Sequence, residues 1–563
     1  MVRVMKSAWI WIVCAGLAIA EEAETEVADA PPLTAAEKVA KKLGAVPAPF
    51  PPTVKGGVGM TISAANDAVQ QSVRDGLTCL HAGWDFEAFR HFAAAMVADP
   101  DCLMAYWGAG LALFHGSAEY AEERDAILDQ MLSLVDAGVG TDLEHRYVFA
   151  LSKLIELGPQ EAASAFAAAA KEYEDDPQLV LMQALMGRGG FDDQGDPTPD
   201  QEREEGRLRG LIEKHPDLTY LKHALLAMRA EAPDLTGDLE LARTLCRESP
   251  DFAPYFHVLG HYEWRCGNHG KAQAAFGRAA DLYAIWMRRS GLGAVDCPGW
   301  TRAECYRAAA LASKGDYETA LAVAEGVSRV AVPQEKALSD GGRMILWEAS
   351  TLPARLLLRR GGAGDMKVAK DLMPHPEIVK GMGKYTLAVW AMQAHSTVVG
   401  TRLALEAKDL DAARTLTEDM TRLGENFVQT RNLAIERAET SQWARAFRNM
   451  EVMASEINGL LSMAGPEKDR GSAFNWYRSA ADRQRRSTLL MPPGVMLPME
   501  ARLAEFHMGR NEADKAMDTL LEGLSKWPRD YELLIRLKEA ATKAGDENMA
   551  AEAEEQLKVL AGQ

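Results

Sequence analysis

The stretch SVRDGLTCLHAGWDFEAFRHFAAAMVADP, residues 72–100, decides the fold. Small residues, one large aromatic residue and a closing proline stand at fixed spacing, at Gly76, Ala88, Phe92, Ala95 and Pro100. Small residues let two antiparallel helices approach, a large side chain fills the gap between them, and proline ends the second helix. The stretch therefore predicts one pair of packed helices.

The same spacing recurs with a period of 34 residues. Gly110 lies 34 residues after Gly76 (110 − 76), and Ala550 lies 34 residues after Ala516 (550 − 516). A further unit carries its small and aromatic residues at Gly260, Gly267, Ala272, Phe276 and Ala279. A fixed period of this length is the signature of a solenoid, in which each unit packs on its neighbours.

This pattern resembles the tetratricopeptide repeat (TPR) family. The resemblance covers nearly the whole chain after its N-terminal segment, with a degenerate middle. The segments at residues 76–113, 257–272 and 491–528 are also similar to exported bacterial TPR proteins of undefined function. The resemblance implies an all-α, right-handed superhelical solenoid of antiparallel helix pairs that binds proteins or peptides in its concave groove.

The N-terminus has the pattern of a secretory signal peptide. Arg3 and Lys6 precede a short apolar run, and an A-x-A site ends at Ala20. We expect cleavage after Ala20 and a periplasmic or secreted protein. The net charge of −19 then becomes −21 (−19 − 2). An acidic surface lacks the basic face that phosphates require, which argues against nucleic-acid binding. No later stretch is apolar enough to span a membrane.

Composition divides the rest of the chain into three regions. Residues 21–60 are acidic, then rich in alanine and proline, which predicts a linker with at most one short helix. We assign residues 61–335 to an N-terminal TPR array and residues 336–563 to a degenerate C-terminal array ending in two TPR units. Residues 188–206 and the stretch LLMPPGVMLP, residues 489–498, interrupt the pattern. Loops of this kind can cap or close the groove of a solenoid.

The six cysteines after the signal peptide match neither a disulfide framework nor a C-x-x-C metal pair. A helical protein of this size does not need disulfides for stability. We therefore expect buried free thiols.

Two histidines four residues apart, in PYFHVLGHYEWRCGN (residues 254–268), form the main candidate site. In a TPR unit the first helix lines the groove. The packing residues of this helix place His257 and His261 on the groove face, with Trp264 and Arg265 just beyond. The two imidazoles stand one helical turn apart, about 5–6 Å between their Cβ atoms.

Neighbouring units add His223, Arg302 and Cys305 at about the same level of the groove. Adjacent first helices pack about 8–10 Å apart. The three histidines and Cys305 are therefore able to converge across three helices. Trp107, on the first helix of another unit, would point into the groove, although packing in the core is the stronger expectation for it.

Three interpretations of this cluster stay open. The histidines can satisfy backbone groups between packed helices. They can also form a polar ligand-binding patch, in which Arg265 and Arg302 hold an anionic group such as a peptide carboxylate and Trp264 supplies apolar area. The third interpretation is a divalent transition metal bound by His223, His257, His261 and Cys305.

The function that we expect from the sequence is binding. The chain lacks H-E-x-x-H, G-x-S-x-G, P-loop and C-x-x-C-H motifs. We predict a scaffold that binds a protein or peptide partner and needs no cofactor. The alternatives are a metal-binding protein or metal-dependent enzyme, and a structural member of an envelope complex.

Overall fold

The computed structural model describes residues 33–44, 46–114, 118–192, 195–374, 386–434, 440–490 and 492–562. The predicted signal peptide and the start of the predicted linker, residues 21–32, lie outside this part of the chain. From Ala35 onward the chain forms one compact unit.

The regular secondary structure of the described residues is helical. Their one β contact is an isolated bridge between Phe191 and Pro197. The first helices are α1 (Ala35–Leu43), α2 (Asp67–His81), α3 (Asp85–Ala98), α4 (Leu103–Ala112), α5 (Ala121–Asp136), α6 (Asp142–Leu157), α7 (Pro159–Glu172), α8 (Pro177–Gly187) and α9 (Pro199–Lys214). The middle of the chain contains α10 (Thr219–Arg229), α11 (Leu239–Glu248), α12 (Ala253–Arg265), α13 (His269–Ser290), α14 (Pro298–Lys314), α15 (Tyr317–Ser328), α16 (Asp340–Met344), the π-helical turn η5 (Ile345–Ala349), α17 (Ser350–Arg360) and α18 (Asp365–Leu372).

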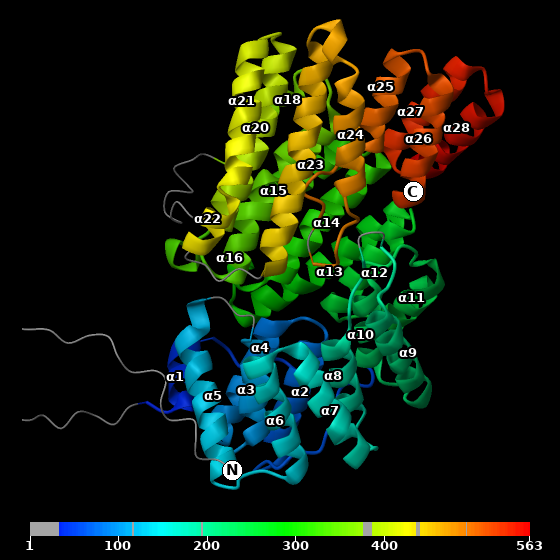
Figure 1. Ribbon diagram of the computed structural model, residues 1–563. Coiled ribbons are helices and arrows are strands. Elements are labelled where there is room, and N and C mark those ends of the chain that lie inside the picture. The colour runs from blue at the N-terminus through cyan, green and yellow to red at the C-terminus, as the bar shows by residue number, and fades with distance from the viewer. Residues whose placement is uncertain are drawn as a thin grey trace, which may run out of the picture. The chain divides into compact units, whose positions relative to one another are not determined.

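The last part contains α20 (Leu387–Glu406), α21 (Leu410–Glu425), α22 (Phe427–Leu433), α23 (Thr440–Ala464), α24 (Ser472–Arg483), α25 (Glu500–Gly509), α26 (Ala513–Lys526), α27 (Tyr531–Ala544) and α28 (Glu547–Gly562). Consecutive helices pack on one another as pairs, such as α2 with α3, α12 with α13, and α25 through α28 (Figure 1). The predicted all-α array of helix pairs is confirmed.

Aromatic rings seated on glycines set how closely the paired helices approach. A Cβ atom on Gly260 of α12 would lie 2.6 Å from the Phe276 ring of α13. The ring of Phe92 occupies the same kind of space against Gly76 and Gly108, where added Cβ atoms would lie 2.7 and 2.3 Å away. The small and large positions read from the sequence are therefore the two sides of one contact.

Local sequence fixes where the helices begin. Thr141 and Glu144 form a capping box at the start of α6. Residues 188–206, expected as a loop, become helical at Pro199, because Thr198 caps α9 and proline suits a first helical position.

Residues 46–66, which lie largely in the predicted linker, run as an extended segment along several helices. The Thr219 hydroxyl donates to the Lys55 carbonyl over 2.6 Å, and the Ser63 amide donates to Glu144 over 2.7 Å. Gly56 has φ +58°, and a Cβ there would lie 1.8 Å from the Asp217 carbonyl oxygen. Side chains of distant helices therefore hold this extended backbone.

The six cysteines of the described chain are free thiols, and all except the partly exposed Cys266 are buried. Within the same residues, no helix combines the length and the apolar character that crossing a bilayer requires.

Replacing Gly260 by alanine tests the glycine–ring contact. The new methyl group would overlap the Phe276 ring, so we expect the free energy of unfolding to fall by about 1–3 kcal/mol. Chemical denaturation followed by circular dichroism measures this loss. The control is Gly206→Ala on α9, where an added Cβ meets no atom within 4 Å. That variant should be neutral or gain up to about 1 kcal/mol, and equal losses in both variants would contradict the packing.

Candidate functional site

The predicted histidines are buried and bonded to backbone carbonyls. His223 Nδ1 lies 2.9 Å from the His81 carbonyl oxygen, and His261 Nε2 lies 2.8 Å from that of Ala230. His257 Nε2 lies 2.8 Å from the carbonyl oxygen of Leu489, which is 232 positions further along the chain. Each histidine therefore has its own partner inside the protein.

The remaining predicted residues are also placed by packing. Trp264 donates to Ser313 over 3.1 Å, and Trp107 donates to the Tyr147 carbonyl over 2.9 Å. Both indoles are buried. Cys305 is fully buried in α14, and burial raises the pKa of its thiol well above the usual range. The pair Arg265 and Arg302 differs from the others, because both side chains are partly exposed.

The histidines and Cys305 do not converge. The α14 side chain in contact with His257 is that of Tyr306, with ring centroids 5.2 Å apart, rather than Cys305. One residue of helical phase, about 100°, separates these two side chains. No group of three His, Cys, Asp or Glu side chains in the described part of the chain is arranged to hold a metal ion.

The Leu489 carbonyl belongs to a segment that fills a groove. We name residues 484–499, between α24 and α25, the connector; Met491 is outside its described part. Tyr306 donates its hydroxyl to the Thr488 carbonyl, and His257 meets the Leu489 carbonyl. The connector then continues between α17, α20 and α23, drawn in orange in Figure 1.

Side-chain nitrogens lie within hydrogen-bonding distance of every connector carbonyl oxygen from Pro492 to Leu497. The contacts run from Arg445 to Pro492 (3.3 Å), Arg355 to Pro493 (3.4 Å), His395 to Gly494 (3.3 Å), Gln484 to Val495 (3.1 Å), Arg359 to Met496 (2.5 Å) and Gln484 to Leu497 (2.9 Å). We name these contacts the carbonyl ladder. They come from α17, α20, α23 and the first residue of the connector itself.

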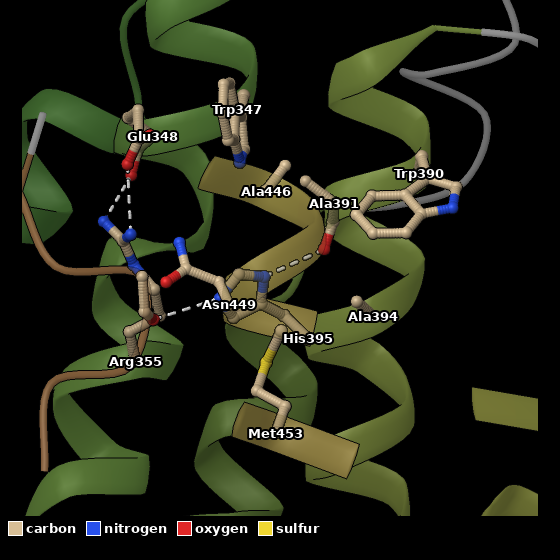
Figure 2. Close-up of a pocket in the computed structure, with 11 residues that line it drawn as sticks. Trp347, Glu348, Arg355, Trp390, Ala391, Ala394, His395, Ala446, Asn449 and Met453 are labelled. Atoms are coloured by element: carbon tan, nitrogen blue, oxygen red, sulfur yellow. Dashed lines mark hydrogen bonds and ion pairs between the residues drawn. The ribbon is translucent and has the colours of Figure 1, made fainter. Parts of the chain in front are cut away.

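A buried ion-pair cluster orients the ladder. The Glu348 carboxylate forms an ion pair with the Arg355 guanidinium over 3.1 Å and a second ion pair with Arg445. Burial alone would raise the pKa of Glu348, but the two guanidinium groups outweigh it and hold this pKa below its usual value. Figure 2 shows Glu348 and Arg355 facing one another, with His395 beside them. Both arginines thereby keep N–H groups free to reach the connector.

The π-helical turn η5 presents Trp347 and Glu348 to this groove. Four residues after Ala349 stands Pro353, which lacks the N–H that a regular helix would direct to the Ala349 carbonyl. A wider turn accommodates the missing bond, and such turns often mark functional sites.

Two adjoining spaces remain beneath the connector. They are narrow, with about 10 and 20 Å³ of room for a water-sized molecule. Four residues line both: Arg355, His395, Met453 and Gly494. His395 Nδ1 is also 2.8 Å from the Ala391 carbonyl oxygen. A neutral imidazole carries one N–H, so His395 donates to Ala391 or to Gly494 but not to both.

A second buried pair ties the groove to the C-terminal units. Arg359 pairs with Asp530 over 2.7 Å while donating to Met496 of the connector. Burial disfavours the charged guanidinium, but the Asp530 carboxylate outweighs it and raises the pKa of Arg359. Tyr317 donates to Glu532 over 2.6 Å beside this pair.

Sequence reasoning missed the ladder residues. Arg355, Arg359 and His395 stand on helices that mix apolar and polar residues, so the local pattern does not mark them as a buried polar network. Their partners lie more than 90 positions away along the chain, which no local spacing reveals.

No protein-family model and no curated protein matches this chain. The repeat spacing and the paired helices decide the fold. The chain is a TPR-like array of antiparallel helix pairs. Solved structures that it is similar to include a human IFIT1 dimer with m7Gppp-AAAA (13% identity, 89% of this chain and 92% of that chain, TM-score 0.34) and yeast Tom70 (11%, 86% and 90%, TM-score 0.25). The P58(IPK) TPR domain is a third (11%, 85% and 99%, TM-score 0.21). At these scores the likeness supports no inference about function.

The buried histidines predict that acid destabilises the helical array. Burial lowers the pKa of His223 to about 4, and of His257 and His261 to about 3. Unfolded histidine has a pKa of about 6.5. The unfolded chain therefore binds protons first, so stability is full above pH 6.5 and falls as the pH drops towards 4.

Each such histidine adds up to about 1.4 kcal/mol per pH unit to this slope. Urea unfolding measured between pH 7 and pH 4.5 tests it. In His261→Gln the slope of the free energy of unfolding against pH should be smaller by the contribution of one proton. A stability that does not change between pH 7 and pH 5 would contradict the buried, neutral state of these rings.

Proposed function

We propose that this protein is a scaffold that binds other proteins by holding an extended segment of the partner in the groove between α17, α20 and α23. The observation that supports this proposal is the carbonyl ladder. The groove already holds one extended segment by its backbone, with side-chain donors from three helices.

Recognition through carbonyl groups suits a binding groove because every residue has a carbonyl. The ladder fixes the direction and register of an extended chain. Arginine suits this role because its guanidinium carries five N–H donors and can bond an acid and a carbonyl at once. Arg359 does so with Asp530 and Met496.

The patch predicted from the sequence has a different place in this proposal. Its histidines and Trp264 support the walls of the array, and His257 anchors the start of the connector. Arg265 and Arg302 remain available for an anionic group of a partner, such as a peptide carboxylate.

The connector makes the groove a competitive site. A tethered segment acts at an effective concentration in the millimolar range. A partner segment therefore binds only if it outcompetes the connector or if the connector has already left the groove. Gly494 is a suitable point to weaken it, because an added Cβ would lie 2.2 Å from the side-chain nitrogen of Asn449.

A labelled peptide with the sequence of residues 484–499 tests the proposal in trans. By fluorescence anisotropy it should not bind the natural chain, whose groove is filled. It should bind full-length Gly494→Ala, whose own connector no longer fits, with a Kd in the micromolar range. Adding Asn449→Ala to Gly494→Ala relieves the clash and should reduce the binding at least tenfold.

A second receptor guards against misfolding of the alanine variant. In it, residues 486–497 are replaced by a glycine–serine linker of equal length, and the peptide should raise its melting temperature. Folded receptors that bind no peptide would overturn the proposal.

We also propose that the mature protein is exported, on the strength of the N-terminal pattern that ends at Ala20. N-terminal sequencing of the protein from its producing cells should start at Glu21. A protein that retains Met1 would contradict export by this route.

A further inference from the structure

Five arginines gather where the connector enters the groove. We name Arg188, Arg265, Arg302, Arg448 and Arg486 the arginine cluster. They come from the end of α8, from α12, α14 and α23, and from the connector itself. Their grouping is unexpected in a chain with net charge −19, because like charges brought together raise the free energy of the folded state.

Shared neighbours place these side chains around one spot. Arg265 donates to the carbonyls of Ala230 and Ala232, over 3.0 and 2.7 Å, on either side of Glu231. Glu231 in turn is within electrostatic reach of Arg265, Arg188 and Arg448. Tyr306 is within electrostatic reach of Arg302 and Glu231. Its hydroxyl donates to the Thr488 carbonyl of the connector.

Most of the cluster makes no hydrogen bond or ion pair to an acidic side chain. Among the described residues, Arg188, Arg302 and Arg448 make no hydrogen bond or ion pair. The Nε atom of Arg302 is buried without an acceptor, and the Ser487 hydroxyl, next to Arg486, is buried without a partner. Buried polar groups are nearly always bonded in folded proteins, so these two atoms are able to bond a group that a partner brings.

The charge balance gives the sign of that ligand. Three of the five guanidinium groups, those of Arg188, Arg265 and Arg448, share one carboxylate, that of Glu231. Burial, and then the charge of Arg486, lower the pKa of Arg265 to about 10. Arg188 and Glu231 reach solvent, yet surrounding protein shifts the pKa of each away from its charged form.

The connector is poorly matched to this spot. Its Arg486 repels the charge of Arg265, although Glu500 is within electrostatic reach of Arg486 and the Lys526 carbonyl lies 3.4 Å from its Nε. The connector residues from Pro492 onward, in contrast, meet the ladder. An acidic residue at the position of Arg486 would replace a repulsion by charge-assisted hydrogen bonds.

We propose that the partner segment taken up by this groove carries acidic residues immediately before an extended, apolar, proline-containing stretch. This inference rests on the proposed function, since it specifies the sequence of the segment that replaces the connector. The acidic residues would lie in the arginine cluster and the following residues on the ladder. The distance suits this arrangement, because the six residue steps from 486 to 492 (492 − 486) span at most about 20 Å when extended.

The experiment compares two labelled peptides on full-length Gly494→Ala at low ionic strength. One has the sequence of residues 484–499, and the other carries Arg485→Glu and Arg486→Glu. The acidic peptide should bind at least tenfold more tightly, and the advantage should shrink as salt is added. The triple variant Arg188→Ala, Arg302→Ala, Arg448→Ala should abolish this preference and leave binding of the first peptide unchanged or stronger.

A matched control removes three exposed arginines elsewhere, with Arg247→Ala, Arg414→Ala and Arg422→Ala, and should keep the preference. Equal binding of both peptides would overturn this inference and leave the proposed function standing. Tighter binding of the unchanged peptide would also overturn this inference. It would mean that the groove prefers the connector sequence, supplied by the same chain or by a second copy. Failure of both peptides would overturn the proposed function and this inference with it.

Discussion

The need to satisfy backbone carbonyls in a buried place governs this protein. The connector crosses the inside of a helical array, where its carbonyls have no helix or sheet of their own to bond. Side-chain nitrogens meet the six oxygens from Pro492 to Leu497 instead. An unmet buried carbonyl costs about 1–3 kcal/mol, so removing the ladder would make this path of the chain untenable.

The same constraint explains why charged residues stand in the core. Arg355 and Arg359 are almost fully buried, and each is held by a carboxylate, Glu348 and Asp530. Burying an ion pair gains little by itself. Here each pair positions donors that serve the connector, and Asp530 links α17 to the turn before α27. Stability and the shape of the groove therefore depend on the same groups.

How much the sequence could predict follows from the range of each interaction. The helix pairs were predictable because Gly260 and Phe276 are near in sequence and recur with the repeat. The candidate site was only partly predictable. His257 and His261, expected on the groove face, are buried against the carbonyls of Leu489 and Ala230, which belong to other units. A one-residue error in helical phase exchanged Cys305 for Tyr306. The connector, although noted as an interruption of the repeat, carries no local signal that it lies in a groove.

The most direct test of this account is the accessibility of the connector to a thiol reagent. Met496 is 7% exposed and lies on the ladder, whereas Leu490 is 52% exposed and lies just before it. The experiment places one cysteine at each of these positions in separate variants and labels them with a maleimide under native conditions. Mass spectrometry identifies the labelled site and measures the labelling rate. The account predicts labelling of Met496→Cys about 100-fold more slowly than of Leu490→Cys, because the connector must first leave the groove. Equal rates would mean that the connector does not occupy the groove, and would contradict the account.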